Sequence, residues 1–466
     1  MTVQSKLATT LCTCKDFQHP WTDSCVNATA GLLLSATPYC LRVYSMVYVL
    51  SLVMRHKIPT LDDLRKTVQG ILQSTAFLVT NSYGFIMFNC LLRYLMGHYT
   101  VYTAAFLPTF LASLMAIVVE RPQRRPLLAL YVANVATESL WNMAVARGWA
   151  KSIPNGQVLI FGASISTLLY LYRLGLHKTT CKDSLFGILR IFVGKTEEGD
   201  AKGKEVKFDD SVPATSTAQR TSRPPVSLST INGWVQLYSR FIGTLKGKHE
   251  SCTHKCGCLS YAVMGGLKPL LGGIGIQVAL KLVMNFKKVI QNKLDWKQTI
   301  LNKKTLNLGL FLGSFSFLYK SVSCGLRHSF NRDDPRFAIP AGLIGSLSFF
   351  YYPDTTVALY VMWKTLQIVY NLGIKEKKVP EVPGFTILLY AFCTAVLFHS
   401  GIMEAKTLRP SYYRFLQAIS GQRLNKFNLV PMDAFGLNTF AQTEEVLKAY
   451  KLTDRTSLPQ CSLASW

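Results

Sequence analysis

Long apolar runs, separated by short polar or basic stretches, occupy most of the chain. A helix that spans a membrane needs about 20 mostly apolar residues. By that measure the pattern predicts five spans in each half of the sequence, at residues 31–54, 71–95, 101–119, 126–146, 157–173, 259–284, 306–327, 337–352, 355–372 and 385–403. The runs at 157–173 and 337–352 are short and would need little tilt or a thinned bilayer. The pattern therefore predicts an all-α fold, that of a polytopic helical membrane protein.

The two sets of spans can be aligned with each other. Three short matches carry the alignment: LSLVM (50–54) with LKLVM (280–284), CLLR (90–93) with CGLR (324–327), and ALYV (129–132) with ALYV (358–361). Matched positions keep their order, and their offsets stay between 229 and 234 residues. We therefore expect two tandem homologous units of four to five transmembrane helices each, a first repeat at 31–175 and a second at 259–403. Repeats often place a transport site at their interface, but duplication for packing alone would leave the same pattern.

Polar segments flank and join the two repeats. Residues 1–30 form a Cys/His-containing tail, 176–258 a polar linker and 404–466 a mostly polar C-terminal tail. Within the linker, SLFGILRIFVGK (184–195) places its apolar residues mostly on one helical face, which predicts an interfacial helix. The Ser/Thr/Pro-rich stretch 211–230 is expected to be disordered.

Composition supports the membrane class. Charged residues make up 16% of the 466 residues and the mean hydropathy is +0.21, whereas an average soluble domain carries about 25% charged residues. The net charge is +26. Because the basic residues are spread over many loops, we expect the lipid bilayer and its anionic lipids as partners, and no nucleic acid.

The basic loops give conflicting orientations. Loops 55–70 and 120–125 and the linker would share one side of the membrane and are all basic, as the positive-inside rule requires. Five spans per repeat would invert the second repeat and place the lysine-rich loop 285–304 on the opposite side. Either the Gly-rich segment 259–284 does not fully span, or the rule is weak for this chain.

Small residues recur four positions apart in the second repeat, a spacing that lets two helices approach closely. The residues are Gly309 with Gly313, Ala341 with Gly345, and Gly342 with Ser346. We expect them to pack helices within one bundle. A pore lining, or a homo-oligomer built through these small-residue faces, is the alternative.

Several charges fall inside the predicted spans: Arg42, Glu138, Lys268, Lys320 and Lys364. A charge at mid-bilayer costs at least a few kcal/mol and usually faces an interior or a wet cavity. One acid in the first repeat and three lysines in the second could meet across the repeat interface and bind an anionic headgroup. The alternative is that Arg42, Lys268 and Lys320 extend to the membrane surface.

A Cys/His-rich segment precedes the first span of each repeat: CTCKDFQHPWTDSC (12–25) and HESCTHKCGC (249–258). Thiolates and imidazoles are zinc ligands, so Cys252, His254, Cys256 and Cys258 are weak metal candidates. Their spacing fits no standard zinc motif. A reduced cluster without a metal or a disulfide are the alternatives.

The motifs of common enzymes are missing. The sequence contains no nucleophile elbow, phosphate-binding loop, zinc-protease helix or dinucleotide fingerprint. We therefore expect no enzymatic activity, no catalytic residues and no cofactor.

Three stretches resemble a known family: VATESLWNMAVARG (135–148), LRIFVGKTEE (189–198) and MEAKTLRPSYYRFL (403–416). They are similar to the transmembrane protein 135 family, also called peroxisomal membrane protein 52, and the resemblance covers nearly the whole chain. It implies a multi-pass protein of peroxisomal and mitochondrial membranes. It also implies roles in mitochondrial fission–fusion balance and in peroxisome-linked handling of fatty acids and cholesterol.

A second, fainter resemblance lies in the hairpin 306–352. A Gly-rich span, a charged turn and an Ala-Gly…Gly span look like the mitochondrial inner-membrane import-channel (Tim) superfamily. Gly313, Arg332, Asp334, Ala341, Gly342 and Gly345 occupy its positions, and Arg327 precedes the turn. The first repeat has Ala112 and Ser113 instead of the glycines.

These observations leave three hypotheses. The chain is an organiser that recruits organelle-division or contact-site proteins through its linker and tail. Alternatively, it is a conduit that moves a lipid or small anionic solute through the duplicated bundle. The import-channel hypothesis rests on the fainter resemblance alone.

Overall fold

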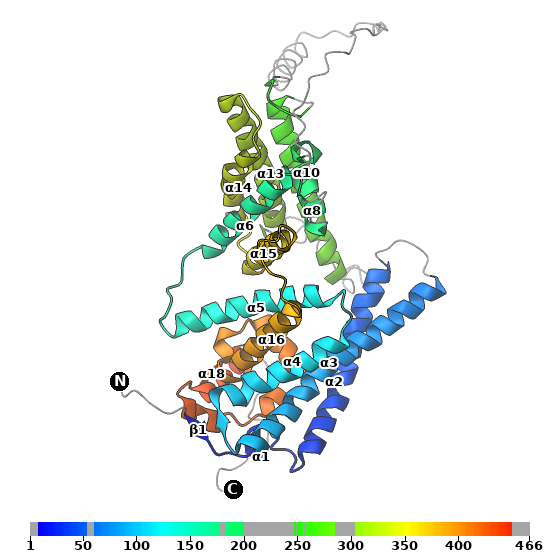
Figure 1. The fold of residues 1–466 in the computed structure, drawn as a ribbon, viewed down its shortest axis with the longest axis vertical. Coiled ribbons are helices and arrows are strands. Elements are labelled where there is room, and N and C mark those ends of the chain that lie inside the picture. Colours follow the sequence, from blue (N-terminus) through cyan, green and yellow to red (C-terminus); the bar gives the residue numbers. More distant parts are fainter. Residues whose placement is uncertain are drawn as a thin grey trace. The chain divides into compact units, whose positions relative to one another are not determined.

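The structure is a computed structural model that describes residues 8–53, 60–176, 183–199, 247, 249–254, 257–284 and 303–449. Helices dominate the described residues (Figure 1). The chain forms two compact units. Unit 1 comprises Met1–Ser152 and Glu381–Trp466, and unit 2 comprises Ile153–Pro380. The predicted all-α fold is confirmed.

Unit 1 is built on five long helices: α2 (Cys25–Val53), α3 (Leu61–Met96), α4 (Leu107–Val119), α5 (Arg125–Ala146) and α16 (Phe385–Met403). Thr60 and Asp63 form a capping box at the start of α3, which satisfies backbone N–H groups that have no partner within the helix. Gly97, at φ +73°, ends the same helix because glycine adopts the left-handed conformation without a Cβ clash. A π-helical turn (Tyr102–Phe106) leads into α4.

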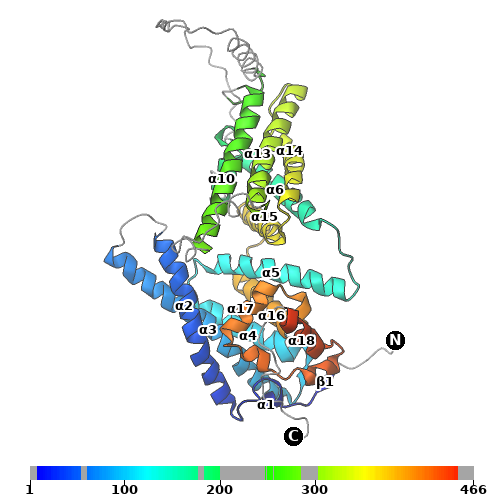
Figure 2. The same cartoon turned by 180° about the vertical axis from the view of Figure 1, so that it is seen from behind.

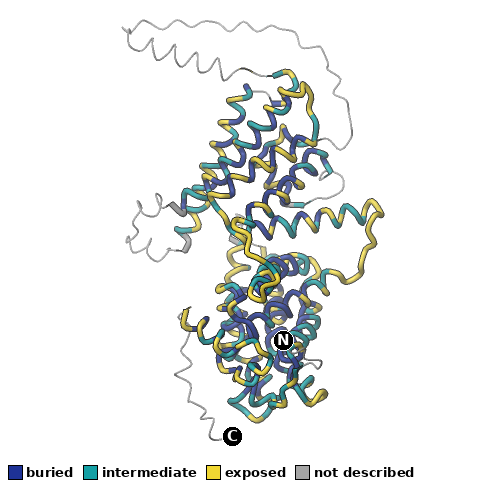
Figure 3. The backbone as a smooth tube through the Cα atoms, turned by 90° about the vertical axis from the view of Figure 1, so that its left-hand side faces the viewer, coloured by how far each residue is buried: buried dark blue, intermediate teal, exposed yellow. Residues whose placement is uncertain are grey.

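Unit 2 contains α6 (Gly156–Arg173), α8 (Ser184–Phe192), α10 (Cys258–Met284), α13 (Lys303–Phe330), α14 (Ala338–Ser346) and α15 (Thr355–Lys375). A 3-10 helix, Leu347–Tyr351, continues α14. Aromatic side chains fill the core, where Phe161 stacks on Phe349 at 4.4 Å between ring centroids and meets Phe311 edge-on at 5.6 Å. Figure 3 shows buried residues along the inner faces of the helices.

The two units repeat one packing order. In each, the first helix of a predicted repeat packs on the second and the second on the third: α2, α3 and α4 in unit 1, and α10, α13 and α14 in unit 2. The fifth helix of each predicted repeat packs in the unit that holds the first four helices of the other repeat. Helix α16, from the second repeat, packs on α4 and α5, whereas α6, from the first repeat, packs on α14 and α15 (Figure 2). The compact units therefore differ from the expected domains 31–175 and 259–403.

Five described helices are long and apolar enough to cross a membrane: Cys25–Leu52, Leu61–Met96, Tyr102–Val119, Cys258–Leu282 and Phe385–Met403. Half of the ten predicted spans thus meet this criterion. Among the others, α14 and its 3-10 extension rise only about 24 Å together, less than the ~30 Å bilayer core. Helices α2 and α10 bury least of their apolar windows inside the protein, 22% and 17%, which suits lipid-facing helices.

The tails contribute to unit 1. Strand β1 (Thr9–Thr10) pairs antiparallel with β2 (Tyr99–Thr100), and α1 (Cys14–Phe17) places Phe17 against Tyr99. The C-terminal segment forms α17 (Pro410–Ile419), α18 (Thr439–Ala449) and short 3-10 helices at Ala405–Thr407, Arg423–Lys426 and Val430–Phe435. Tyr412, Tyr413 and Leu416 on α17 are buried. Up to residue 449, the expected polar tail is therefore a packed part of unit 1, because α17 is amphipathic.

Helix α8 lies where an interfacial helix was predicted, but its apolar face packs inside unit 2. Leu185, Phe186 and Leu189 belong to the unit 2 core, while Ile188 and Ile191 remain exposed. A 3-10 turn, Lys195–Glu197, follows the helix. The expected disordered stretch 211–230 lies outside the described residues.

Candidate metal centres and buried charges

A cluster of thiols and one imidazole forms where the N-terminal segment meets the first two long helices. This first cluster comprises Cys14, His19, Cys25 and Cys90, whose ligand atoms all lie within 4.8 Å of one another. The Sγ atoms of Cys14 and Cys25 are 3.5 Å apart, and the Sγ of Cys90 is 3.5 Å from His19 Nε2. His19 is fully buried, and its Nδ1 lies 2.9 Å from the carbonyl oxygen of Thr22.

Local structure fixes these four residues. Thr13 and Asp16 form a capping box around the short helix that carries Cys14. On α3, one turn beyond Cys90, Arg93 donates hydrogen bonds to the carbonyl oxygens of Cys12 and Leu11 at 2.7 and 2.9 Å. The N-terminal segment is thus held against the end of α3, next to the start of α2.

A second cluster has the same composition in unit 2. Cys252, His254, Cys258 and Cys324 place their ligand atoms within 4.8 Å of one another. The Sγ atoms of Cys252 and Cys258 are 3.7 Å apart, and Cys324 Sγ is 3.3 Å from His254 Nε2. The buried His254 ring stacks on Tyr261 at 4.3 Å between ring centroids.

The two clusters match in chain order: a cysteine, then a histidine, both before the first helix of a predicted repeat; a cysteine at its first residue; and a cysteine on the second helix. Three of the four candidates predicted from the sequence, Cys252, His254 and Cys258, belong to the second cluster, while Cys256 lies outside the described residues. Sequence reasoning missed Cys90 and Cys324 as members. The aligned pairs CLLR and CGLR contained the signal, since they place these cysteines at corresponding positions.

Hydrogen bonding within the first cluster changes the acidity of its members. Hydrogen bonds from the Cys90 thiol and from His19 hold the pKa of Cys14 below its usual range. Burial alone would lower the pKa of His19, but hydrogen bonds with Cys14 and the Thr22 carbonyl raise it. The arrangement therefore favours a thiolate on Cys14, and thiolates are the form that binds metals.

The predicted intramembrane charges have partners within their own units. Glu138 on α5 forms an ion pair with Arg409, which precedes α17. Lys364 on α15 lies 2.7 Å from Asp183, at the start of α8, and donates to Gln367. Glu138 and Lys364 are therefore members of ion pairs that join elements of the same unit.

The remaining predicted charges are distributed differently. Lys320 on α13 is buried and lies over the Tyr261 ring, 4.9 Å from its centroid, whereas Lys268 and Arg42 are exposed on α10 and α2. Glu138, Lys320 and Lys364 lie on α5, α13 and α15, none of which is among the five described helices long and apolar enough to span. That these charges meet across a repeat interface stays a prediction.

A buried ion network surrounds Arg327 in unit 2. Arg327 binds Glu197 through both terminal nitrogens, at 2.9 and 2.6 Å, and donates through Nε to Asp333 at 2.8 Å. Arg173 on α6 also pairs with Asp333. Burial alone would raise the pKa of Asp333, but Arg173 and Arg327 hold it below its usual value. Arg327 was one of three predicted hairpin residues, and the other two lie outside this network: Arg332 is exposed, and Asp334 caps the following 3-10 helix (Pro335–Phe337).

The small residues meet other helices of unit 2. A Cβ on Gly313 would lie 2.6 Å from Leu270 Cβ, and one on Gly309 would lie 2.7 Å from the Leu270 carbonyl oxygen. Helices α10 and α13 therefore touch backbone to backbone. On α14, a Cβ on Gly342 would lie 3.0 Å from Ser166 Cα, Ser346 lies against Gly162, and Gly345 faces Phe315. Ala341 is fully buried. These faces are covered within the unit, so they offer no free surface for a homo-oligomer.

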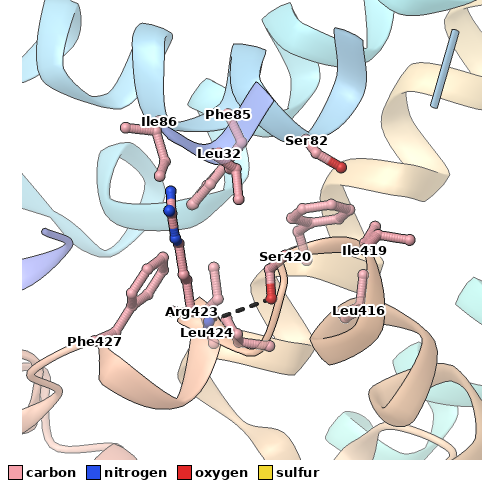
Figure 4. Close-up of a pocket in the computed structure, with 12 residues that line it drawn as sticks. Leu32, Ser82, Phe85, Ile86, Leu416, Ile419, Ser420, Arg423, Leu424 and Phe427 are labelled. Atoms are coloured by element: carbon pink, nitrogen blue, oxygen red, sulfur yellow. Dashed lines mark hydrogen bonds between the residues drawn. The ribbon is translucent and has the colours of Figure 1, made fainter. Parts of the chain in front are cut away.

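A small pocket in unit 1, of about 30 Å³, has room for little more than a water molecule. Leu32, Ile86, Leu416 and Phe427 are among the apolar side chains that line it, and the Arg423 guanidinium reaches into it (Figure 4). Burial lowers the pKa of Arg423, which also lies over the Trp21 ring. The pocket is too small for a lipid in this conformation.

The comparison with known families matches the part of the chain that holds the first cluster. Residues 12–145 match the family described as the N-terminal cysteine-rich region of Transmembrane protein 135. No solved structure matches the chain. The match does not extend to residues 306–352, so the likeness to the import-channel superfamily is not confirmed. The match over residues 12–145 supports the resemblance of this chain to the transmembrane protein 135 family.

Proposed function

We propose that this protein is a non-enzymatic organiser in the membranes of peroxisomes and mitochondria. In this role it regulates mitochondrial fission–fusion balance and peroxisome-linked fatty acid and cholesterol homeostasis. The family match over residues 12–145 is the observation that carries the proposal, and five candidate membrane spans support the membrane setting. The expected partners are organelle-division or contact-site proteins and anionic lipids.

The ion pairs favour an organiser over a conduit. A conduit for an anionic solute needs charged groups that are free to bind and release it. Glu138 is instead paired with Arg409, and Lys364 with Asp183. Lys320 is buried against Tyr261. With these partners, each charge stabilises packing within its own unit and is a poor candidate for a solute-binding group.

A charge-swap rescue tests the proposal. Null cells would receive wild type, Glu138→Arg, or the double variant Glu138→Arg/Arg409→Glu. After targeting is checked, mitochondrial length and peroxisomal lipid content are scored in the same cells. We expect the single variant to lose abundance or function and the double variant to regain both, because the swap restores the ion pair.

Two outcomes distinguish the hypotheses. If the double variant is stable and correctly targeted but fails on lipid content, a negative charge is required at position 138 itself. The conduit hypothesis would then replace the organiser. A variant lacking residues 200–246, part of the linker, gives the converse test. If the deletion variant rescued null cells fully, residues 200–246 would not be the segment that recruits partners.

A further inference from the structure

We propose that the protein holds two structural Zn²⁺ ions, one in each unit, bound by the first cluster and the second cluster. Each ion would have three thiolates and one imidazole as ligands. The ligands are Cys14, His19, Cys25 and Cys90 in unit 1, and Cys252, His254, Cys258 and Cys324 in unit 2. This inference is independent of the organiser role proposed above.

The distances fit one tetrahedral ion at each site. With Zn–S near 2.3 Å and Zn–N near 2.0–2.1 Å, a tetrahedron has S–S edges of about 3.8 Å and S–N edges of about 3.6 Å. The observed S–S separations are 3.5 Å for Cys14–Cys25 and 3.7 Å for Cys252–Cys258. The S–N separations are 3.5 Å for Cys90–His19 and 3.3 Å for Cys324–His254. All four agree within a few tenths of an ångström.

The histidine of the first cluster is oriented for metal binding. His19 Nδ1 lies 2.9 Å from the Thr22 carbonyl oxygen, a group that can only accept, so Nδ1 carries the proton. Nε2, 3.5 Å from Cys90 Sγ, is then the nitrogen left to bind the ion. Metal-binding histidines usually donate their other N–H to a carbonyl or carboxylate in this way. In the second cluster, stacking on Tyr261 fixes the His254 ring.

A disulfide or an iron–sulfur centre fits the two clusters less well than zinc. A disulfide would join two thiols and leave the third thiol and the histidine without a role. An iron–sulfur centre needs ligands spread around several irons, whereas all ligand atoms here lie within 4.8 Å of one another. Four protein ligands also leave no open position, which is typical of structural and not catalytic zinc.

Each ion would join three segments. In unit 1 it would link α1 and the following loop to the first residue of α2 and to the C-terminal part of α3. In unit 2 it would link residues 252–254 to α10 and α13 in the same way. In unit 1 the ion would add to the hydrogen bonds from Arg93 that already hold the N-terminal segment against α3.

Metal content of the full chain purified in detergent tests the proposal. We expect two Zn²⁺ per wild-type chain by elemental mass spectrometry, one in Cys90→Ala, one in Cys324→Ala and none in the double variant. Cys393→Ala is the matched control, because Cys393 is also a cysteine on a helix but belongs to neither cluster, and it should retain both ions. The untouched site of each single variant reports whether the chain has folded.

Cobalt provides a second readout. Chains produced with Co²⁺ should show the absorption bands of tetrahedral thiolate coordination, reduced by half in each single variant. Zinc-free wild type produced in metal-replete medium would overturn the proposal, as would an intact Cys14–Cys25 or Cys252–Cys258 disulfide in the unreduced chain. A single ion lost only in Cys324→Ala would overturn the first site, and one lost only in Cys90→Ala would overturn the second.

Discussion

Arg327 has no solvent exposure, and its guanidinium binds two carboxylates, those of Glu197 and Asp333. A buried arginine that lost its partners would carry a large desolvation penalty. The bidentate geometry with Glu197 uses the planar fork of the guanidinium, which lysine does not have. The pair joins α13 to the turn after α8, so one residue fixes part of the linker to the second repeat.

Replacing Arg327 should destabilise unit 2 strongly. Arg327→Leu leaves Glu197 buried without its bidentate partner, and we expect a loss of about 3–5 kcal/mol. Thermal unfolding of the full chain in detergent measures it. Arg332→Leu is the control, since Arg332 is exposed in the same hairpin, and it should change stability by less than about 0.5 kcal/mol. Equal effects of the two substitutions would contradict the structural role of the network.

At the residue scale, sequence reasoning named Arg327 but not its partners Asp333 and Glu197. The resemblance to the import-channel superfamily pointed to Arg332 and Asp334 in the turn, whereas the ion network uses Asp333. Adjacent positions in a turn point in different directions, and a pattern of residue types does not resolve which one faces inward. Glu197 lies 130 residues from Arg327. Only the folded chain brings such a pair together.

At the element scale, α10 and α13 approach each other backbone to backbone. A Cβ added to Gly273 would lie 2.8 Å from the Gly309 Cα, whereas a Cβ added to its neighbour Gly272 would have no atom within 4 Å. Close backbone approach allows dense van der Waals packing, which is the main attraction between helices in a membrane.

The two neighbouring glycines give a matched pair of substitutions. Gly273→Ala places a methyl group against backbone atoms that cannot rotate away, and we expect a loss of about 1–3 kcal/mol. Gly272→Ala points into open space and should be neutral or slightly stabilising. Thermal unfolding in detergent compares them. If Gly272→Ala destabilised as much as Gly273→Ala, the contact face would have to be assigned to another side of α10.

Helix positions were largely predictable from apolar runs, because helices occur at each predicted span. Which of these helices could cross a membrane was less predictable. The run at 337–352 becomes a nine-residue α-helix and a 3-10 turn, too short for a bilayer. The packing of α17 was missed because its apolar face, including Tyr412 and Leu416, is diluted by polar residues within a mostly polar segment.

At the scale of the whole molecule, the exchange of α6 and α16 defines the two units. Sequence alignment paired the short motifs but could not show which predicted copy of the fifth helix packs in which unit. An exchanged and an unexchanged arrangement of such repeats have the same hydrophobic pattern. Contacts such as Gly342 with Ser166, and Asn81 with Tyr390 at 3.1 Å, distinguish the two arrangements.

Two fragments of equal length test the exchange. Residues 153–380 contain all of unit 2, whereas 176–403 follow the second repeat and replace α6 by α16. We expect the first fragment to be monodisperse in detergent and resistant to proteolysis. The second should aggregate, because Gly342 and Ser346 on α14 lose the small-residue face of α6. A well-folded 176–403 fragment together with an aggregated 153–380 fragment would contradict the exchanged arrangement.

The position of α16 also sets the order in which the protein can be completed during synthesis. Helices α2 to α5 emerge from the ribosome first, but the helix that covers α4 and α5 follows only after all of unit 2 has been made. Throughout that interval the nascent unit 1 presents an uncovered helix face, which makes such intermediates prone to wrong association. Unit 2, by contrast, has all its helices once α15 is made. A premature stop between residues 381 and 384 would therefore spare unit 2 and leave unit 1 open, although four of its five long helices would be intact.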